Sequence, residues 1–255
     1  MNRRGTVVIL PNAEAVADEA AQRIAHLAEA AIDALGVFRI GLSGGGTPRA
    51  THERLTSEPY RSRIDWSKVE VFWSDERAVP PDDPESNYRM AVETLLSRAP
   101  IPNDAVFRMP ADQPDLDAAA DDYQETLQRV FGSALPVFDV LILGLGDDGH
   151  TASLFPHSRQ LDSGDRLVVA GDPPVAGSAG PSPSVRRLTF TPRLINAARE
   201  RIFLVEGVGK AGPVRDVLTG PEQPDEWPAQ QISGGPALPL WLIDEAAASL
   251  LPGGR

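Results

Sequence analysis

Short apolar runs alternate along the chain with longer segments whose apolar residues recur at helical spacing. A short apolar run bounded by turn residues is typical of a strand, whereas recurrence every three to four residues over a longer window is typical of a helix. The runs predict strands at 6–10, 37–42, 69–73, 138–143, 201–205 and 240–243. Helices are predicted from a cap at Asn12 to about residue 35, from Pro48 with Thr47 as the cap, from a cap at Ser86 to about residue 96, over 115–131, beginning at 151–155, from 210 to about 218, and after 243.

The alternation of strands and helices favours an α/β fold. The run 138–143 is almost continuously apolar, as expected of a strand buried on both faces of a parallel sheet. Helices on both faces of a mostly parallel, Rossmann-like sheet give a three-layer sandwich. The stretches 171–184 and 221–239 lack regular periodicity, but no composition shift flanks either of them. We therefore expect both to be surface loops of a single domain over 1–255.

Composition and charge narrow the class of protein. The 255 residues carry a formal net charge of −12 and include no cysteine, which excludes disulfide scaffolds, thiol nucleophiles and cysteine-ligated metal sites. No basic block offsets the negative charge, so we expect no nucleic-acid partner. No run approaches the roughly 20 apolar residues of a membrane span, and Pro11 ends the first apolar run too early for a signal peptide. The sequence predicts a cytoplasmic protein, in a class where enzymes of small metabolites are common.

A glycine-rich turn follows the predicted strand 37–42. In Gly41-Leu-Ser-Gly-Gly-Gly-Thr-Pro48, three glycines let backbone N–H groups crowd around an anion at a helix N-terminus, and the hydroxyls of Ser43 and Thr47 add donors. The alternatives are a bare strand-to-helix turn and a nucleophile elbow with Ser43 as the nucleophile. The turn lacks the Gly-Lys-Ser/Thr of a Walker loop, and only about forty residues precede it, few for an elbow. Phosphate binding is the favoured interpretation.

A second strand end carries Trp73-Ser-Asp-Glu-Arg77. The guanidinium of Arg77 suits a phosphate or carboxylate, which it would bind in a bidentate manner. Asp75 is a candidate base or a residue that holds Arg77 in place. A solvated turn with no function is the competing interpretation.

The third strand end carries Gly144-Leu-Gly-Asp-Asp-Gly-His150. It matches G-x-G-x-x-G, but Asp147 and Asp148 would face a pyrophosphate with two negative charges, which argues against a dinucleotide. Imidazole titrates near neutral pH, so His150 suits a general base that Asp148 would orient. A histidine that only caps the loop is the alternative. His-x-His and His-Glu-x-x-His pairs are absent from the sequence, so we expect no metal site.

Two basic residues in the second half of the chain are further candidates for binding an anion. Lys210 opens a predicted helix after Gly207-Val-Gly, and Arg187 stands in Arg186-Arg-Leu-Thr-Phe-Thr191. Each is either a plain surface charge or an anion contact. A protein of net charge −12 that binds a dianion must concentrate positive charge locally, which favours a role for both.

These segments occur in a fixed order over nearly the whole chain. They are Leu42-Ser-Gly-Gly-Gly-Thr-Pro48, Trp73-Ser-Asp-Glu-Arg77 with Ser86-Asn-Tyr88, Leu143-Gly-Leu-Gly-Asp-Asp-Gly-His-Thr-Ala-Ser-Leu-Phe-Pro156, Arg187-Leu-Thr-Phe-Thr191 through Ile195-Asn-Ala-Ala198, Gly207-Val-Gly-Lys210, and Trp241-Leu-Ile-Asp-Glu-Ala246. Together they resemble the 6-phosphogluconolactonase family, in the superfamily that also holds the glucosamine-6-phosphate deaminases.

The resemblance implies a sugar-phosphate isomerase/deaminase-like fold and hydrolysis of 6-phosphoglucono-1,5-lactone, the second step of the oxidative pentose phosphate pathway. It implies a small sugar-phosphate lactone as the partner, with no metal or organic cofactor. His150 would activate water, with Asp148 and Arg77 as further catalytic residues. The implied substrate and phosphate pocket comprises Ser43, Gly44, Gly45, Gly46, Thr47, Asp75, Arg77, Arg187 and Lys210. Gly46 stands where the lactonases commonly have serine.

Two departures separate the chain from the deaminases, whose corresponding stretch reads Asp-Gly-His-Ile-Ala-Phe-Asn-Glu-Pro. Leu154 and Phe155 stand where the deaminases have Asn-Glu, and Arg77 stands where they have tyrosine. Both departures favour the lactonases. Non-enzymatic sugar-phosphate regulators of related fold are a further alternative, but no residues remain here for their helix-turn-helix module.

Overall fold

The structure is a computed structural model, and it describes residues 4–172 and 185–252. Its main sheet has six strands in the order β1-β9-β8-β5-β2-β3, and every adjacent pair is parallel. These strands are β1 (Thr6–Leu10), β2 (Phe38–Leu42), β3 (Val69–Trp73), β5 (Val140–Leu143), β8 (Glu200–Val205) and β9 (Leu240–Asp244). All six were predicted from the apolar runs, with ends that agree within two residues.

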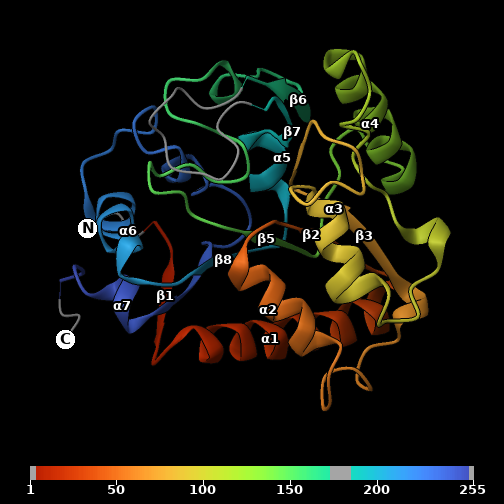
Figure 1. The fold of residues 1–255 in the computed structure, drawn as a ribbon, viewed down its shortest axis with the longest axis horizontal. Helices are drawn as coiled ribbons and strands as arrows, with labels where there is room; N and C mark the ends of the chain where they lie inside the picture. The colour runs from red at the N-terminus through yellow and green to blue at the C-terminus, as the bar shows by residue number, and fades with distance from the viewer. Residues whose placement is uncertain (1–3, 173–184, 253–255) are drawn as a thin grey trace.

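Helices cover the main sheet. The α-helices are α1 (Ala13–Leu35), α2 (Gly46–Leu55), α3 (Asn87–Ala91), α4 (Leu116–Phe131), α5 (Pro192–Ala197), α6 (Ala211–Thr219) and α7 (Glu245–Ala248). The wider turn η2 (Val92–Leu96) continues α3, and the single 3-10 turns are η1 (Trp66–Lys68), η3 (Asn103–Ala105), η4 (Arg159–Leu161), η5 (Val208–Lys210) and η6 (Pro228–Gln231). Figure 1 shows α1 and α2 below the row of strands and α4 above it. The α/β prediction with a mostly parallel sheet is therefore confirmed.

A second sheet was not predicted. The strands β4 (Asp75–Arg77), β7 (Arg187–Phe190) and β6 (Val168–Gly171) pair antiparallel in that order. The segment after β3, where no strand was predicted, forms β4 because its backbone pairs with β7, more than a hundred residues away. This sheet packs on α4 (Figure 1), and it carries three of the predicted site residues, Asp75, Arg77 and Arg187.

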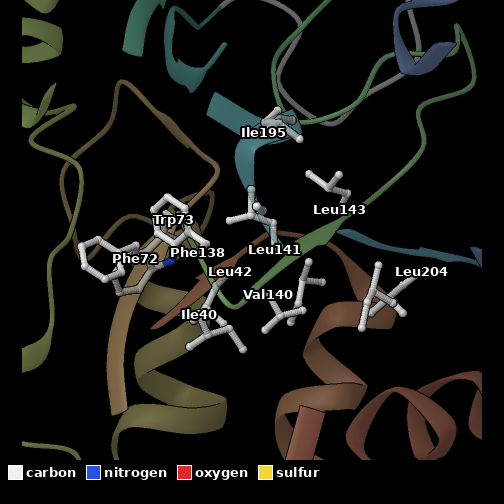
Figure 2. Packing of buried hydrophobic residues seen from close by; sticks show 14 of the residues in the cluster. Ile40, Leu42, Phe72, Trp73, Phe138, Val140, Leu141, Leu143, Ile195 and Leu204 are labelled. Atoms are coloured by element: carbon white, nitrogen blue, oxygen red, sulfur yellow. The ribbon is translucent and has the colours of Figure 1, made fainter. Parts of the chain in front are cut away.

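The core is continuous between the faces of the main sheet and the elements that cover them. All four residues of β5 are fully buried. The side chains of its consecutive residues Val140 and Leu141 point to opposite faces of the sheet (Figure 2). At one edge, Phe72 packs against Phe107 and Phe138, with ring centroids 4.8 Å and 5.2 Å apart. Burying each such side chain stabilises the fold by roughly 1.5–3 kcal/mol.

Two local predictions were wrong. Thr47 is not the cap of α2, because the helix begins at Gly46 with Gly45 as its N-cap, at a φ of +112° that favours glycine. The helix expected at 151–155 is a buried turn in which Ala152 has a φ of +48°. Its backbone bonds outward instead, and Ser153 N donates to Thr189 Oγ1 at 3.1 Å.

The two predicted surface loops differ in outcome. The stretch 221–239 is not wholly on the surface, because Ala229 and Gln230 are buried and Ala229 N donates to Gly149 O at 3.0 Å. Of the stretch 171–184, residues 173–184 lie outside the described residues. In the described part of the chain, no helix combines the length and the apolar character needed to cross a bilayer.

Candidate active site

A cavity of about 440 Å³ lies at the carboxyl ends of β2, β5 and β8. Parallel strands deliver the turns that follow them to one edge of a sheet, which is where ligands bind in such folds. The lining residues are Ser43, Gly44, Gly45, Gly46, Thr47, Pro48, Asp75, Arg77, Asn87, Gly144, Leu145, Gly146, Asp147, His150, Ala152, Phe155, Arg187, Leu204, Val205, Glu206 and Lys210. Every predicted site residue is in this set except Asp148, which does not line the cavity but is hydrogen-bonded to His150.

The glycine-rich turn between β2 and α2 forms one wall. Gly45, the N-cap, has no side chain to satisfy the first N–H groups of α2, and the structure records no capping hydrogen bond there. These N–H groups and the positive end of the helix dipole suit an anion. A Cβ on Gly44 would stand 2.0 Å from Asn87 Oδ1. The turn therefore needs glycine both for its conformation and for its close contact with α3.

The turn after β5 holds His150. Gly146 N donates to His150 O at 2.8 Å, and Gly149 N donates to Gly146 O at 3.1 Å with Gly149 at a φ of +77°. A Cβ on Gly146 would stand 2.0 Å from His150 Nδ1. The glycines of G-x-G-x-x-G thus close a tight turn around an imidazole, a different use from dinucleotide binding.

Asp148 and His150 form a hydrogen-bonded pair. His150 Nδ1 lies 2.5 Å from Asp148 Oδ1, and His150 N donates to the same oxygen at 3.1 Å. Burial by itself would raise the pKa of Asp148, but the hydrogen bond and charge of His150 outweigh it and hold that pKa below its usual range. An ionised Asp148 accepts from Nδ1–H, which leaves the lone pair of the imidazole on Nε2. Among the described residues, none forms a hydrogen bond with Nε2.

The antiparallel sheet supplies a second wall. Arg77 ends β4 opposite Arg187 in β7, and Arg77 Nη1 donates to Glu85 O at 2.5 Å. The ring of Phe155 lies between Arg187 and His150, 5.5 Å from the guanidinium carbon and 4.7 Å from the imidazole centroid. Burial lowers the pKa of Arg187, although a guanidinium stays protonated at any ordinary pH.

Asp75 is held by protein groups. Ser153 Oγ donates to Asp75 Oδ2 at 2.6 Å, and Asn87 Nδ2 donates to Oδ1 at 3.2 Å. The guanidinium within 4.0 Å is that of Arg187, although Arg77 was the partner considered from the sequence. Asp75 as a whole is only 4 % exposed. These contacts make Asp75 the link between β4, the turn after β5, and β7.

Lys210 reaches the cavity from β8, which lies on the other side of β5 from the strand that precedes the glycine-rich turn. It ends η5 after β8, where Gly207 at a φ of +90° turns the chain back toward the sheet edge. Its Nζ lies 2.5 Å from Asp147 Oδ1. The structure thus brings Lys210 to the same cavity as the glycine-rich turn, paired with a carboxylate from the turn after β5.

Several residues at the site were not identified as functional from the sequence. Asn87 and Ser153 fall within quoted motifs, but their contacts with Asp75 join segments distant in the chain. Glu206 lines the cavity directly after β8, and its position behind a strand and before Gly207 was the available signal. In residues 4–172 and 185–252, no group of three or more His, Cys, Asp or Glu is placed to hold a metal ion.

Comparisons with known proteins agree on the family. Residues 11–241 match the family model described as glucosamine-6-phosphate isomerases/6-phosphogluconolactonase. The 6-phosphogluconolactonase of Synechocystis sp. is 39% identical over 224 residues, which cover 87% of this chain and 88% of the relative. The 6-phosphogluconolactonase of Mycobacterium tuberculosis is 38% identical over 253 residues, 97% of this chain and 98% of the relative.

A solved structure extends the likeness to three dimensions. The structure of 6-phosphogluconolactonase from Trypanosoma brucei superimposes with a TM-score of 0.82 at 30% sequence identity. The match covers 98% of this chain and 100% of that chain. The predicted isomerase/deaminase-like fold is therefore confirmed.

Proposed function

Since the chain belongs to the family of glucosamine-6-phosphate isomerases and 6-phosphogluconolactonases, we propose that it hydrolyses 6-phospho-D-glucono-1,5-lactone to 6-phospho-D-gluconate. It is an enzyme of the lactonase branch, acting in the second step of the oxidative pentose phosphate pathway. The observation that carries the proposal is that the His150–Asp148 pair and the glycine-rich turn line or adjoin one cavity. A base and an anion cradle are what a phosphorylated lactone requires.

The phosphate is assigned to the glycine-rich turn. The free N–H groups at 43–47, the helix dipole behind them and Lys210 would hold the dianion, with Arg77 and Arg187 adding positive charge. Holding the phosphate fixes the distance from it to the lactone carbonyl. This positions C1 near His150 and lowers the entropic cost of reaction.

His150 is the proposed general base. Its Nε2 takes a proton from water, the water oxygen attacks C1, and the carbonyl electron pair moves onto the exocyclic oxygen. The C1–ring oxygen bond then breaks, and imidazolium returns the proton to the ring oxygen, which leaves as a hydroxyl. Asp148 fixes the tautomer and stabilises the imidazolium. A positioned base of this kind typically contributes about 10²- to 10⁴-fold.

Arg77 is the oxyanion donor we favour. We call the turn after β5 that holds His150, residues 144–150, the catalytic turn. Its N–H groups at Gly146, Gly149 and His150 already donate inside the turn, so they are poor candidates. Arg77 gives one hydrogen bond to Glu85 O and has further N–H groups to donate. A guanidinium facing the developing charge stabilises it more than it stabilises the neutral carbonyl.

Two further assignments accompany this function. We propose that residues 1–255 act as a single domain and that the enzyme works in the cytoplasm. The continuous hydrophobic core supports the first, and the absence of a membrane-spanning helix among the described residues is compatible with the second.

The experiment is a coupled assay with freshly prepared 6-phosphogluconolactone, run with and without a chelator. Rapid formation of 6-phosphogluconate above the spontaneous rate is expected. A parallel reaction with glucosamine 6-phosphate tests the deaminase alternative. Ammonia release there, without lactone hydrolysis, would overturn the proposal.

A further inference from the structure

Lys210 is paired with a protein carboxylate at the cavity. Its ammonium lies 2.5 Å from Asp147 Oδ1, and both side chains line the cavity. Asp147 belongs to the turn that Gly146 N closes on His150 O, so the catalytic turn itself delivers this carboxylate. The Lys210 and Asp147 side chains are 28% and 49% exposed. A partly solvated pair of this kind is weak enough to exchange partners.

The helix end has a similar neighbour. Glu206 Oε1 lies 3.5 Å from the position that a Cβ on Gly46 would occupy, and Gly46 is the first residue of α2. Glu206 therefore stands beside the positive end of the α2 dipole. Both features assigned to phosphate, the ammonium and the helix N-terminus, thus have a protein carboxylate next to them.

We propose that Asp147 and Glu206 are internal competitors of the substrate phosphate and set how tightly the cavity holds it. The inference rests on the proposed function, because it needs a phosphate at Lys210 and α2. Binding of the dianion exchanges Asp147 for a phosphate oxygen on Lys210, and it places negative charge beside Glu206. Asp147 acts through Lys210, and neither carboxylate touches the reacting carbon, so both are specificity-determining and positioning residues.

The probe is inorganic phosphate, measured both by direct calorimetric titration and as a competitive inhibitor. Asp147→Asn keeps the shape of the side chain and removes its charge. Because an exposed ion pair contributes little, we expect phosphate to bind about 1.5- to 5-fold more tightly to this variant. The KM for the phosphorylated lactone should fall by a similar factor. Glu206→Gln should change phosphate binding in the same direction.

Asp104→Asn is the matched control. Asp104 is exposed and does not line the cavity, and its substitution by asparagine changes the net charge by the same amount as Asp147→Asn. Its phosphate affinity should stay at the wild-type value. If Asp104→Asn tightened phosphate binding as much as Asp147→Asn, the effect would belong to net charge and the proposal would be overturned.

A double-mutant cycle with Lys210→Ala tests whether Asp147 acts through the lysine. The gain from Asp147→Asn should be smaller in the Lys210→Ala background. An equal gain in both backgrounds, or no gain in the wild-type background, would overturn the inference. If Lys210→Ala weakens phosphate binding while Asp147→Asn leaves it unchanged, the inference fails and the proposed function stands. If Lys210→Ala itself has no effect on phosphate binding, the phosphate assignment fails first, and the competitor role fails with it.

Discussion

His52 makes the stability of the protein depend on pH in a way that a single substitution can isolate. It lies on α2, 0 % exposed, and its Nδ1 is 3.1 Å from Thr94 Oγ1. Thr94 Oγ1 donates to Met90 O at 2.7 Å, so the hydroxyl accepts from His52 and Nδ1 carries the proton. His52 Nε2 is buried with no hydrogen-bond partner. Protonation there would create a buried charge with no acceptor.

The direction and the size of the pH dependence of stability follow from the pKa of His52. Burial first, and the charge of Arg49 second, lower the pKa of His52 from 6.5 to about 4. Below pH 6.5 the unfolded chain binds a proton that the folded chain refuses until about pH 4, so the free energy of unfolding falls as the pH falls through this window. The difference of about 2.5 pKa units corresponds to about 3 kcal/mol, and about 2–3 kcal/mol of it is lost between pH 7 and 4.5.

The assay is urea unfolding of the wild type and His52→Gln at several pH values between 7 and 4.5. Other groups also titrate there, so the informative quantity is the difference between the two profiles. Glutamine does not titrate and retains a donor for Thr94, so its profile should be flatter by about 2–3 kcal/mol. His157→Gln is the control, because His157 is exposed and pairs with Glu226 at the surface. Parallel profiles for the wild type and His52→Gln would refute the reasoning.

Two further predictions concern the active site. Lys210→Ala should raise KM for the phosphorylated lactone by about 10-fold or more, since hydrogen bonds to charged groups contribute about 1.5–3 kcal/mol. The kinetics with unphosphorylated gluconolactone should change little, and an equal loss on both substrates would contradict the phosphate assignment. Gly146→Ala places a Cβ 2.0 Å from His150 Nδ1 and should lower kcat at least 10-fold. Gly212→Ala, where a Cβ meets nothing within 4 Å, should retain activity; similar losses in both variants would point to general misfolding.

The hydrophobic pattern was sufficient to predict the main sheet because its inner strands are buried on both faces, and the exposed edge strand β1 is still a continuous apolar run. β5 has four fully buried residues, and such a run has few alternatives to a central parallel strand. The motifs then placed His150, the glycine-rich turn and Lys210 at one edge, since parallel strands all end there. This part of the site follows from local sequence and from the rule that parallel strands share an edge.

The remaining features depend on contacts between distant segments. β4 has only three residues, too few to show an alternation, and it becomes a strand by pairing with β7. The 151–155 turn gives up helical hydrogen bonds because Ser153 bonds to Thr189 and Asp75. The pairing of Asp147 with Lys210 joins residues 63 positions apart. Sequence periodicity carries no signal for such pairs.

The most direct test of the central claim is the steady-state kinetics of His150→Asn with 6-phosphogluconolactone. Asparagine removes the proposed base but leaves the phosphate contacts in place. We predict that kcat falls about 10²- to 10⁴-fold while KM changes by less than about 3-fold, which corresponds to about 0.65 kcal/mol. A variant with wild-type kcat would contradict the assignment of His150 as the base, and with it the account of this cavity as the catalytic site.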